Sequence, residues 1–247
     1  MNANTDNNDI NTSLPKIKSV LILIGIIIFF VLISLIANSW FNKQTIRTIN
    51  IKGNYILTDA EINSIIDDKI MNTEQQGLNL ADIKRTLIRN EFIENADVFI
   101  NSKRILGIKI IERVPFAILI NKSGIPYFID TNKNIFVYKL FNNYTDLPII
   151  TNCNSPEQRT NAIKILSELQ KKFPFLYAKV CEVSYDKNNY NLILNIADIS
   201  INIGDITDLD TKLATIESFL NNITKLSNDI NKFKKLDARW KNKIVVN

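Results

Sequence analysis

The chain of 247 residues is 46% hydrophobic and 22% charged, a balance that is typical of folded rather than disordered proteins. Its net charge of +5 is mild and spread along the chain, whereas nucleic-acid-binding proteins carry denser basic stripes, so we expect no nucleic-acid partner. Histidine is absent, which excludes His-containing catalytic triads, histidine metal ligands and a histidine pH switch.

The two cysteines, Cys153 and Cys181, have neither the number nor the spacing of a four-ligand zinc site, so no metal site is expected. Two interpretations of them remain open. If the body of the protein is exported, they can form a single disulfide. Otherwise they are unpaired thiols, with Cys181 on an apolar strand face and Cys153 in a loop.

An apolar run without a charge covers residues 20–37. At about 1.5 Å of rise per residue, a helix of this length is about 27 Å long and just spans a hydrocarbon core. A cleaved signal peptide has a shorter apolar run, and a buried soluble helix has a polar face. We therefore predict a transmembrane helix over residues 20–38, after a disordered tail over residues 1–19. Lysine and arginine are nearly balanced around the helix, so charge alone does not orient it.

Five elements are predicted in the next seventy residues, in the order strand, helix, helix, strand, strand. The first strand covers residues 45–52, and the helix after it begins at a capping-box pattern formed by Thr58 and Glu61. A second helix covers residues 80–90. The two strands that follow alternate apolar and polar residues, and they cover residues 96–100 and 106–110. Val114-Pro115 marks a boundary, because proline does not continue a central strand.

The remainder of the chain is rich in predicted strands and contains two helices. Ser155-Pro156-Glu157-Gln158 has an N-cap, a first-turn proline and a capping-box glutamine, and it begins the first helix. The second helix has apolar residues at helical spacing from Leu209 to Ile223. Short strands are predicted over residues 116–120, 127–129, 135–138, 180–185, 190–196, 199–203 and 236–246.

Three signatures in residues 49–117 resemble the FtsQ/DivIB family. Residues 49–62 are similar to the strand, glycine and Ser/Thr-x-x-Glu-Ile opening of that family's POTRA domain. Residues 92–98 resemble a Pro-Trp-Val-x-x-Ala-x-Val segment, with Glu91-Phe92 in place of Pro-Trp. Glu112-Arg113-Val114-Pro115 resembles the Glu-Arg-x-Pro hinge.

Three further signatures follow in family order. Residues 128–136 resemble a Val-Asp-x-x-Gly-x-Val-Phe hairpin, although the glycine itself is absent. Leu147-Pro148 and Ile203-Gly204 come next. Residues 237–242 look like the terminal Asp-Leu-Arg-Tyr signature. No single signature is specific, but six in order behind an apolar anchor identify a strong resemblance.

The resemblance implies an α+β fold with a single N-terminal transmembrane helix. A βααββ POTRA domain is expected over residues 44–114, and a mixed β-rich domain with flanking helices over residues 115–247. It implies a single-pass protein of the bacterial inner membrane, with a cytoplasmic N-terminus and a periplasmic body concentrated at the division site. Such proteins are non-enzymatic scaffolds that dock FtsB- and FtsL-type proteins and the septal peptidoglycan synthase machinery, and they need no cofactor.

The expected means of docking is strand addition, in which a partner strand completes the unpaired backbone groups of a sheet edge. The terminal strand predicted over residues 236–246 is the candidate edge. The resemblance places partner binding there, at Trp240 together with the neighbouring polar and basic residues Arg239, Lys241, Asn242 and Lys243. The alternative is that Trp240 belongs to the core and the lysines only guard the edge against aggregation.

Catalysis has no candidate site in the sequence. Asp67 and Asp68 are adjacent on a helix and face different directions, and no Gly-x-Ser-x-Gly motif or glycine-rich phosphate loop is present. A POTRA-bearing transport or secretion component is the alternative function, although the long series of barrel strands typical of that class is missing. A membrane-anchored hydrolase is disfavoured by the lack of histidine.

Overall fold

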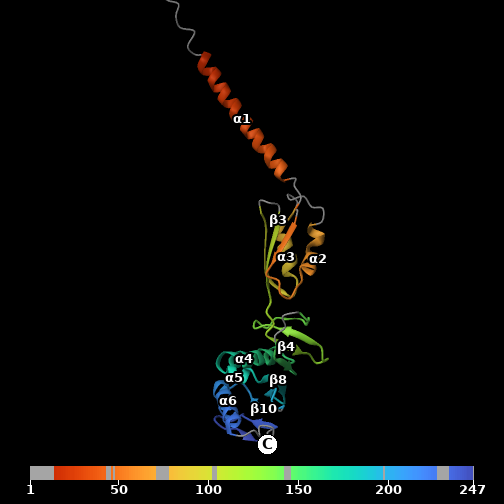
Figure 1. The fold of residues 1–247 in the computed structure, drawn as a ribbon, viewed down its shortest axis with the longest axis vertical. Coiled ribbons are helices and arrows are strands. Elements are labelled where there is room, and N and C mark those ends of the chain that lie inside the picture. Colours follow the sequence, from red (N-terminus) through yellow and green to blue (C-terminus); the bar gives the residue numbers. More distant parts are fainter. Residues whose placement is uncertain are drawn as a thin grey trace, which may run out of the picture. The chain divides into compact units, whose positions relative to one another are not determined.

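The computed structural model describes residues 14–42, 46, 48–70, 78–101, 105–141, 146–196, 198–226 and 234–246. The chain divides into two compact units (Figure 1). One contains Met1–Lys52, Asp59–Leu87 and Ala96–Ile110, and the other contains Gly53–Thr58, Ile88–Asn95 and Ile111–Asn247. The predicted α+β class, with an N-terminal apolar helix and a β-rich body, is confirmed. The predicted domain boundaries all stay predictions, and most of the tail predicted over residues 1–19 lies outside the described residues.

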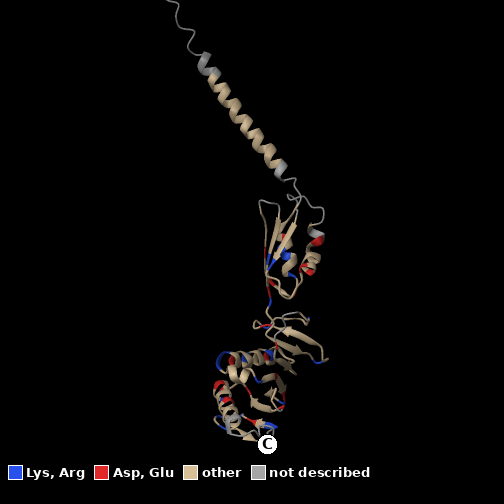
Figure 2. Ribbon diagram, in the orientation of Figure 1, with Lys and Arg blue, Asp and Glu red and all other residues tan. Residues whose placement is uncertain are grey.

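The N-terminal helix α1, Leu14–Asn42, is 29 residues long. Its segment Ser19–Ser39 has a mean hydropathy of 3.4, and its side chains are exposed throughout. Figure 2 shows no charged residue along this segment. Burying an apolar side chain of this size is worth about 1.5–3 kcal/mol, so a run of this length favours a non-aqueous environment. By length and composition this helix can cross a membrane.

A three-stranded sheet in the order β1-β3-β2 and two helices follow. The elements are β1 Thr48–Lys52, α2 Asp59–Ile70, α3 Leu80–Ile88, β2 Ile93–Ile100 and β3 Ile105–Glu112. Strand β1 pairs in parallel with β3, and α2 begins directly after Thr58, as the capping pattern predicts. The helices bury Ile62, Ile66, Ile83 and Leu87, which are at most 1% exposed. The predicted order of two helices between strands is therefore present.

Glu112 and Arg113 bind two chain segments that come from far away in the sequence. The Glu112 carboxylate, only 7% exposed, accepts hydrogen bonds from the backbone N–H groups of Tyr55, Ile56 and Leu57 at 2.7, 2.7 and 2.8 Å. The Arg113 Nε donates to the Glu91 carbonyl oxygen at 3.0 Å. A buried carboxylate is stable only when it is hydrogen-bonded, so this part of the Glu-Arg-x-Pro motif has a structural role.

The second unit is built on a nine-stranded mixed sheet in the order β12-β11-β10-β9-β8-β7-β4-β5-β6. Its strands are β4 Ala117–Ile120, β5 Pro126–Ile129, β6 Ile135–Val137, β7 Ile149–Thr151, β8 Val180–Asp186, β9 Asn189–Leu194, β10 Ser200–Gly204, β11 Lys235–Asp237 and β12 Val245–Val246. Helices α4 Pro156–Lys172, α5 Pro174–Tyr177 and α6 Leu209–Leu226 lie on one side of it (Figure 1). Ser155 and Gln158 form the predicted capping box of α4. The Lys172 Nζ joins α4 to α6 by contacting Asp210 at 2.7 Å.

One face of this sheet carries a continuous apolar row toward the helices. The row consists of residues paired in register on consecutive strands, Leu119, Ile150, Val183, Leu192, Ile201 and Leu236. These side chains are at most 5% exposed and belong to the same core cluster as Leu166 and Leu169 of α4 and Leu213 and Ile216 of α6. The alternation of these strands thus directs one face to the core, as predicted.

The opposite face of the sheet is covered only in part. At the β5–β6 end, aromatic rings pack against one another, with centroids 5.5 Å apart for Phe128 and Phe136 and 5.6 Å for Phe92 and Phe136. Further along the sheet the paired residues Ile118 and Ile149 are half-buried, and Lys235 is exposed. This second face is therefore closed near β6 and more open over the central strands.

Two elements lie where the sequence predicted only connections. β7 has just three residues after Leu147-Pro148, and α5 has four residues after Phe173. The two cysteines are free thiols, so they form no disulfide in this structure. Cys153 is buried in the loop after β7, and Cys181 is exposed on β8.

Candidate docking surface at the carboxyl-terminal sheet edge

The prediction of one strand over residues 236–246 is wrong. β11 ends at Asp237, the chain reverses between Trp240 and Lys243, and β12 returns antiparallel to β11. The Lys243 N–H donates to the Trp240 carbonyl oxygen at 3.3 Å, and Asn242 has a φ of 59°. Asparagine tolerates this left-handed conformation, so the turn forms without glycine. Alternating residues continue through the turn, which is why the pattern alone did not reveal it.

β12 is the outermost strand at this end of the sheet in the described part of the chain. Val246 pairs with Leu236 and therefore lies on the core face, at the end of the apolar row. Val245 pairs with Asp237 on the other face. Val246 is 41% exposed and Val245 is 47% exposed, whereas Leu236 is 2% exposed. An apolar strand edge therefore extends the core row out to solvent.

The Arg239 guanidinium is held by the Asp237 carboxylate. Its Nε lies 3.0 Å from Oδ1, and its Nη2 lies 2.6 Å from Oδ2. These hydrogen bonds lower the pKa of Asp237 below its usual value and raise the pKa of Arg239, so both groups are charged at neutral pH. The paired geometry fixes the guanidinium, which lies 5.8 Å from the Trp240 ring centroid.

Gly204, at the end of β10, makes room for this arrangement. Its φ is 68°, a conformation that residues with a Cβ rarely adopt. A Cβ at this position would lie 3.0 Å from the Arg239 Cγ. Ile203-Gly204 was assigned only by resemblance, and the structure gives it this steric role.

Trp240 is 57% exposed, so it is not a core residue. It lines a shallow pocket of about 320 Å³ together with Asn188, Asp205, Lys212 and Arg239. The Lys212 Nζ, on a residue only 4% exposed, donates to the Asp205 carbonyl oxygen at 3.0 Å and contacts Oδ1 at 3.1 Å. Hydrogen bonds from Thr207 and then from Lys212 lower the pKa of Asp205. The pocket beside the indole therefore has fixed, internally paired charges.

The structure gathers the five predicted partner-binding residues on one exposed turn. Arg239 and Trp240 contact each other, and Lys241, Asn242 and Lys243 are exposed beside them. The sequence predicted an edge along the whole of residues 236–246, whereas the edge strand in the structure is Val245–Val246 alone. Residues 234–246 contain five basic residues and one acidic residue, Asp237, whose charge is engaged by Arg239. The surface around the edge is therefore positively charged.

Reactive groups elsewhere in the described residues do not gather into a site. No cluster of three or more cysteine, aspartate or glutamate side chains that could hold a metal occurs there. Burial raises the pKa of the Cys153 thiol to about 12, and burial also raises that of Cys181. Both thiols are protonated at neutral pH, and a protonated thiol is a poor nucleophile.

The anchor, the body and the edge together define a class. A helix that can cross a membrane, followed by an α+β body whose sheet ends in an open edge, fits a single-pass membrane protein. The model of the family described as FtsQ/DivIB, C-terminal related, matches residues 114–247, more than half of the chain. The chain therefore belongs to this family, and the resemblance found in the sequence is confirmed.

Family membership indicates a role in cell division and partners among the proteins of the division complex, and such proteins are generally non-enzymatic. No curated protein matches the chain.

Proposed function

We propose that this protein is a non-enzymatic scaffold of the inner membrane that docks FtsB- and FtsL-type proteins at the division site. Its N-terminus would lie in the cytoplasm and its body in the periplasm, with a POTRA domain before the β-rich domain. The observation that carries the proposal is the exposed edge of β12 in a chain of this family. The septal peptidoglycan synthase machinery would be brought to the site through these partners.

Docking would proceed by addition of a partner strand beside β12. An edge strand has N–H and C=O groups that point away from its sheet, and a partner strand satisfies them without rearranging the fold. Because Val246 ends the buried row, the partner residue beside it would extend the core and shield both apolar side chains. Trp240, exposed on the adjoining turn, would then pack against the partner, as aromatic residues do at the centres of interfaces.

The charges around β12 would select an acidic partner segment. Lys241 and Lys243 flank the edge, and the Arg239 charge is already engaged by Asp237. A cationic surface attracts an acidic segment during encounter, and it repels a basic one. The electrostatic part of the binding should therefore weaken as salt is raised, while the strand pairing persists.

Strand addition can be tested directly with proline at the two edge positions. In an antiparallel pair the N–H groups point alternately toward and away from the neighbouring strand, so one of Val245 and Val246 directs its N–H outward. Proline at that position removes the outward donor and leaves the β11–β12 bonds intact, whereas proline at the other position also disturbs the hairpin. Full-length Val245→Pro and Val246→Pro variants should be co-purified with the FtsB-type protein of the same cell.

We expect both variants to lose the partner. At least one of them should keep the melting temperature of the wild type, which shows that its fold is intact. Trp240→Glu should also lose the partner without loss of folding, while Phe175→Ala, which changes an exposed aromatic outside this surface, should retain it. If all edge variants keep the partner, β12 is not the docking strand.

The cellular role has a separate test. Depletion of the protein should produce filaments, and a fluorescent fusion should gather at midcell. Uniform envelope fluorescence together with normal division after depletion would contradict a division role.

A further inference from the structure

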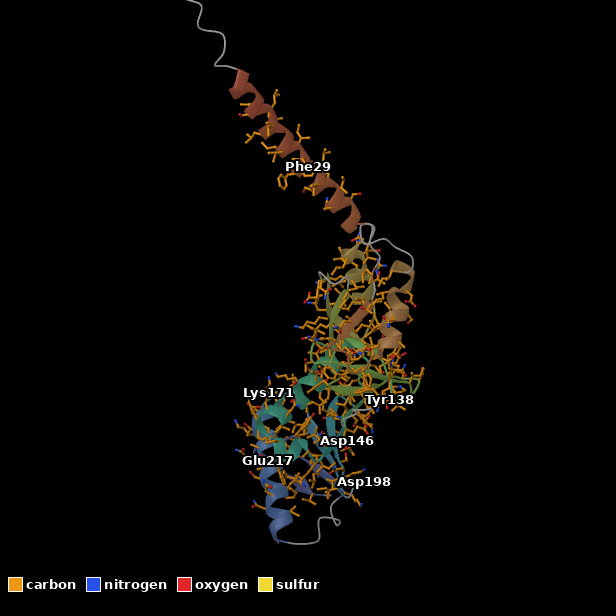
Figure 3. The ribbon with its side chains drawn as sticks, turned by 45° about the horizontal axis from the view of Figure 1, so that its top comes forward. Phe29, Tyr138, Asp146, Lys171, Asp198 and Glu217 are labelled. Carbon is orange, nitrogen blue, oxygen red and sulfur yellow. The ribbon has the colours of Figure 1, made fainter. Side chains whose placement is uncertain are left out.

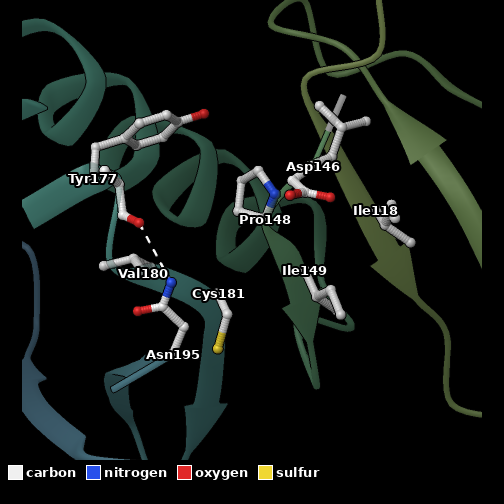
Figure 4. A pocket seen from close by; sticks show the side chains of 10 residues that line it. Ile118, Asp146, Pro148, Ile149, Tyr177, Val180, Cys181 and Asn195 are labelled. Carbon is white, nitrogen blue, oxygen red and sulfur yellow. Dashed lines mark hydrogen bonds between the residues drawn. The ribbon is translucent and has the colours of Figure 1, made fainter. Parts of the chain in front are cut away.

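A second surface feature lies where the beginnings of β4, β7 and β8 meet the end of α5. It is a groove of about 540 Å³ over β4, β7 and the beginning of β8 (Figure 4). Its lining includes Ile118, Leu147, Ile149, Tyr177, Cys181 and Asn195. The groove lies at other strands than β12. None of its lining residues belongs to the surface proposed above to dock the division partners.

The floor of the groove is apolar because of the strand register. Ile118 on β4 pairs with Ile149 on β7, so both side chains emerge on the same face, and both are half-buried. Ile149 pairs in turn with Glu182 on β8, which pairs with Ile193 on β9. The floor is thus a fixed part of the sheet and does not depend on a mobile side chain.

A bulge in β8 opens one wall of the groove. The register shifts between Val180 and Glu182, so Cys181 has no opposite residue in the ladder. Its Sγ lies 3.2 Å from the Ile193 carbonyl oxygen, and its side chain remains exposed. Such bulges redirect a side chain and interrupt strand pairing. Cys181 therefore lies at the wall of an apolar depression, where reagents can reach it.

The charged side chains near the groove include several acidic ones, although the chain as a whole has a net charge of +5. Asp146 lines the groove, and Glu182 and Asp198 act electrostatically on Cys181. Asp146 and Asp198 lie on the side of the sheet away from Lys171 of α4 and Glu217 of α6 (Figure 3). Lys179, the lysine beside the groove in sequence, directs its Nζ over the Phe175 ring, 4.5 Å from the centroid.

We propose that this groove docks a short apolar segment of a partner protein that carries lysine or arginine beside its apolar residues. The isoleucine floor would bind the apolar side chains, and the basic ones would pair with Asp146 in the lining and with Asp198 near Cys181. An acidic rim repels anionic lipid headgroups and nucleic-acid phosphates, so a basic protein segment is the occupant that fits. The β12 edge has the opposite charge, so the two surfaces select different segments.

Cys181 provides the readout of a direct test. Because Cys153 is only 3% exposed, maleimide should modify the folded full-length protein in detergent at Cys181 alone. The Cys181 thiol is mostly protonated at neutral pH, so labelling is followed above pH 7 and every rate is compared with that of the peptide-free protein at the same pH. The labelling rate is measured in the presence of three acetylated and amidated peptides: Lys-Leu-Ile-Leu-Lys, its acidic counterpart Glu-Leu-Ile-Leu-Glu, and the polar Lys-Ser-Gly-Ser-Lys. The first peptide should slow labelling on the order of fivefold or more at saturation, and the other two should leave the rate within twofold.

Charge variants separate the groove from non-specific binding to the detergent micelle. The double variant Asp146→Asn with Asp198→Asn should lose the protection by the basic apolar peptide. Asp186→Asn changes an exposed acidic residue at the other end of β8, so it should retain the protection. Raising salt from about 0.05 to 0.5 M should weaken the protection, because rim charges are screened.

The proposal is overturned if the basic apolar peptide gives no protection at millimolar concentration, or if the acidic peptide protects equally. It is also overturned if the double variant keeps full protection. The proline variants at β12 should leave Cys181 protection unchanged, so this result and the test of the division partner can fail independently.

Discussion

The two edge strands of the nine-stranded sheet differ in how far other segments of the chain cover them. At β6 the Val137 N–H donates to the Glu91 Oε2 at 3.0 Å, and Phe92 packs its ring against Phe136. At β12 no such cover occurs within the residues that the structure describes, and both valines are more than 40% exposed. Natural sheets usually protect their edges. A protein that covers one edge with its own chain and leaves the other open has an edge available for a partner.

Removing an aromatic ring at the covered edge should have the largest effect on folding. Phe136 is 1% exposed and packs against both Phe92 and Phe128. Phe136→Ala should lower the free energy of unfolding by about 3–5 kcal/mol, through lost burial and a cavity. Chemical denaturation of the full-length protein measures this change. A loss below about 1 kcal/mol would show that the aromatic cluster does not stabilise this end of the sheet.

The buried carboxylate of Glu112 should have the next largest effect. Glu112→Gln replaces a charged acceptor of three backbone hydrogen bonds by an amide that has only one oxygen, so a donor loses its partner. We expect a loss of about 2 kcal/mol in the free energy of unfolding. Glu94→Gln, an exposed glutamate nearby in sequence, is the matched control and should leave stability unchanged within about 0.5 kcal/mol. Equal effects of the two variants would contradict a specific role for Glu112.

The Asp237–Arg239 pair at the open edge should give a smaller and pH-dependent effect. Because folding lowers the pKa of Asp237, its contribution is present above the unfolded value of about 3.9 and is lost as pH falls through the lower folded value. Asp237→Asn should therefore reduce the melting temperature at pH 7, and the difference should shrink as pH falls below about 4. Thermal melts of the two proteins across this range measure the difference. A constant difference at all pH values would contradict the ion pair.

Uncovering β6 should have the smallest effect on stability and the most informative effect on association. Glu91→Ala removes the carboxylate that accepts the Val137 N–H, at a cost of about 0.5 kcal/mol. The uncovered edge should then self-associate, which sedimentation velocity in detergent would detect. A monodisperse variant would show that the Glu91 contact does not protect this edge.

Much of the fold followed from local patterns in the sequence. The apolar run predicted α1, the Ser155–Gln158 pattern predicted the start of α4, and alternation predicted most strands. These signals are local, because capping and side-chain periodicity act within a few residues. β7 was missed since three residues are too few to show a period, and its pairing with β4 and β8 is what makes it a strand.

The candidate surfaces were less predictable, because they depend on distant contacts. The terminal hairpin forms through the left-handed Asn242, while the alternation of residues continues unchanged through the turn. The partner-binding assignments to Trp240 and its neighbours stay predictions, although the structure places all of them on one exposed turn. The groove at Cys181 depends on the register of three strands and on a bulge, which a single sequence does not reveal.

Docking at the open edge is tested most directly by comparing partner binding with folding in the same variants. Binding of the FtsB-type protein is measured for the wild type, Val245→Pro and Val246→Pro, together with the melting temperature of each. If a partner strand pairs with β12, at least one proline variant should melt like the wild type and still lose at least about tenfold in affinity. Wild-type affinity in both variants would contradict docking by strand addition at β12.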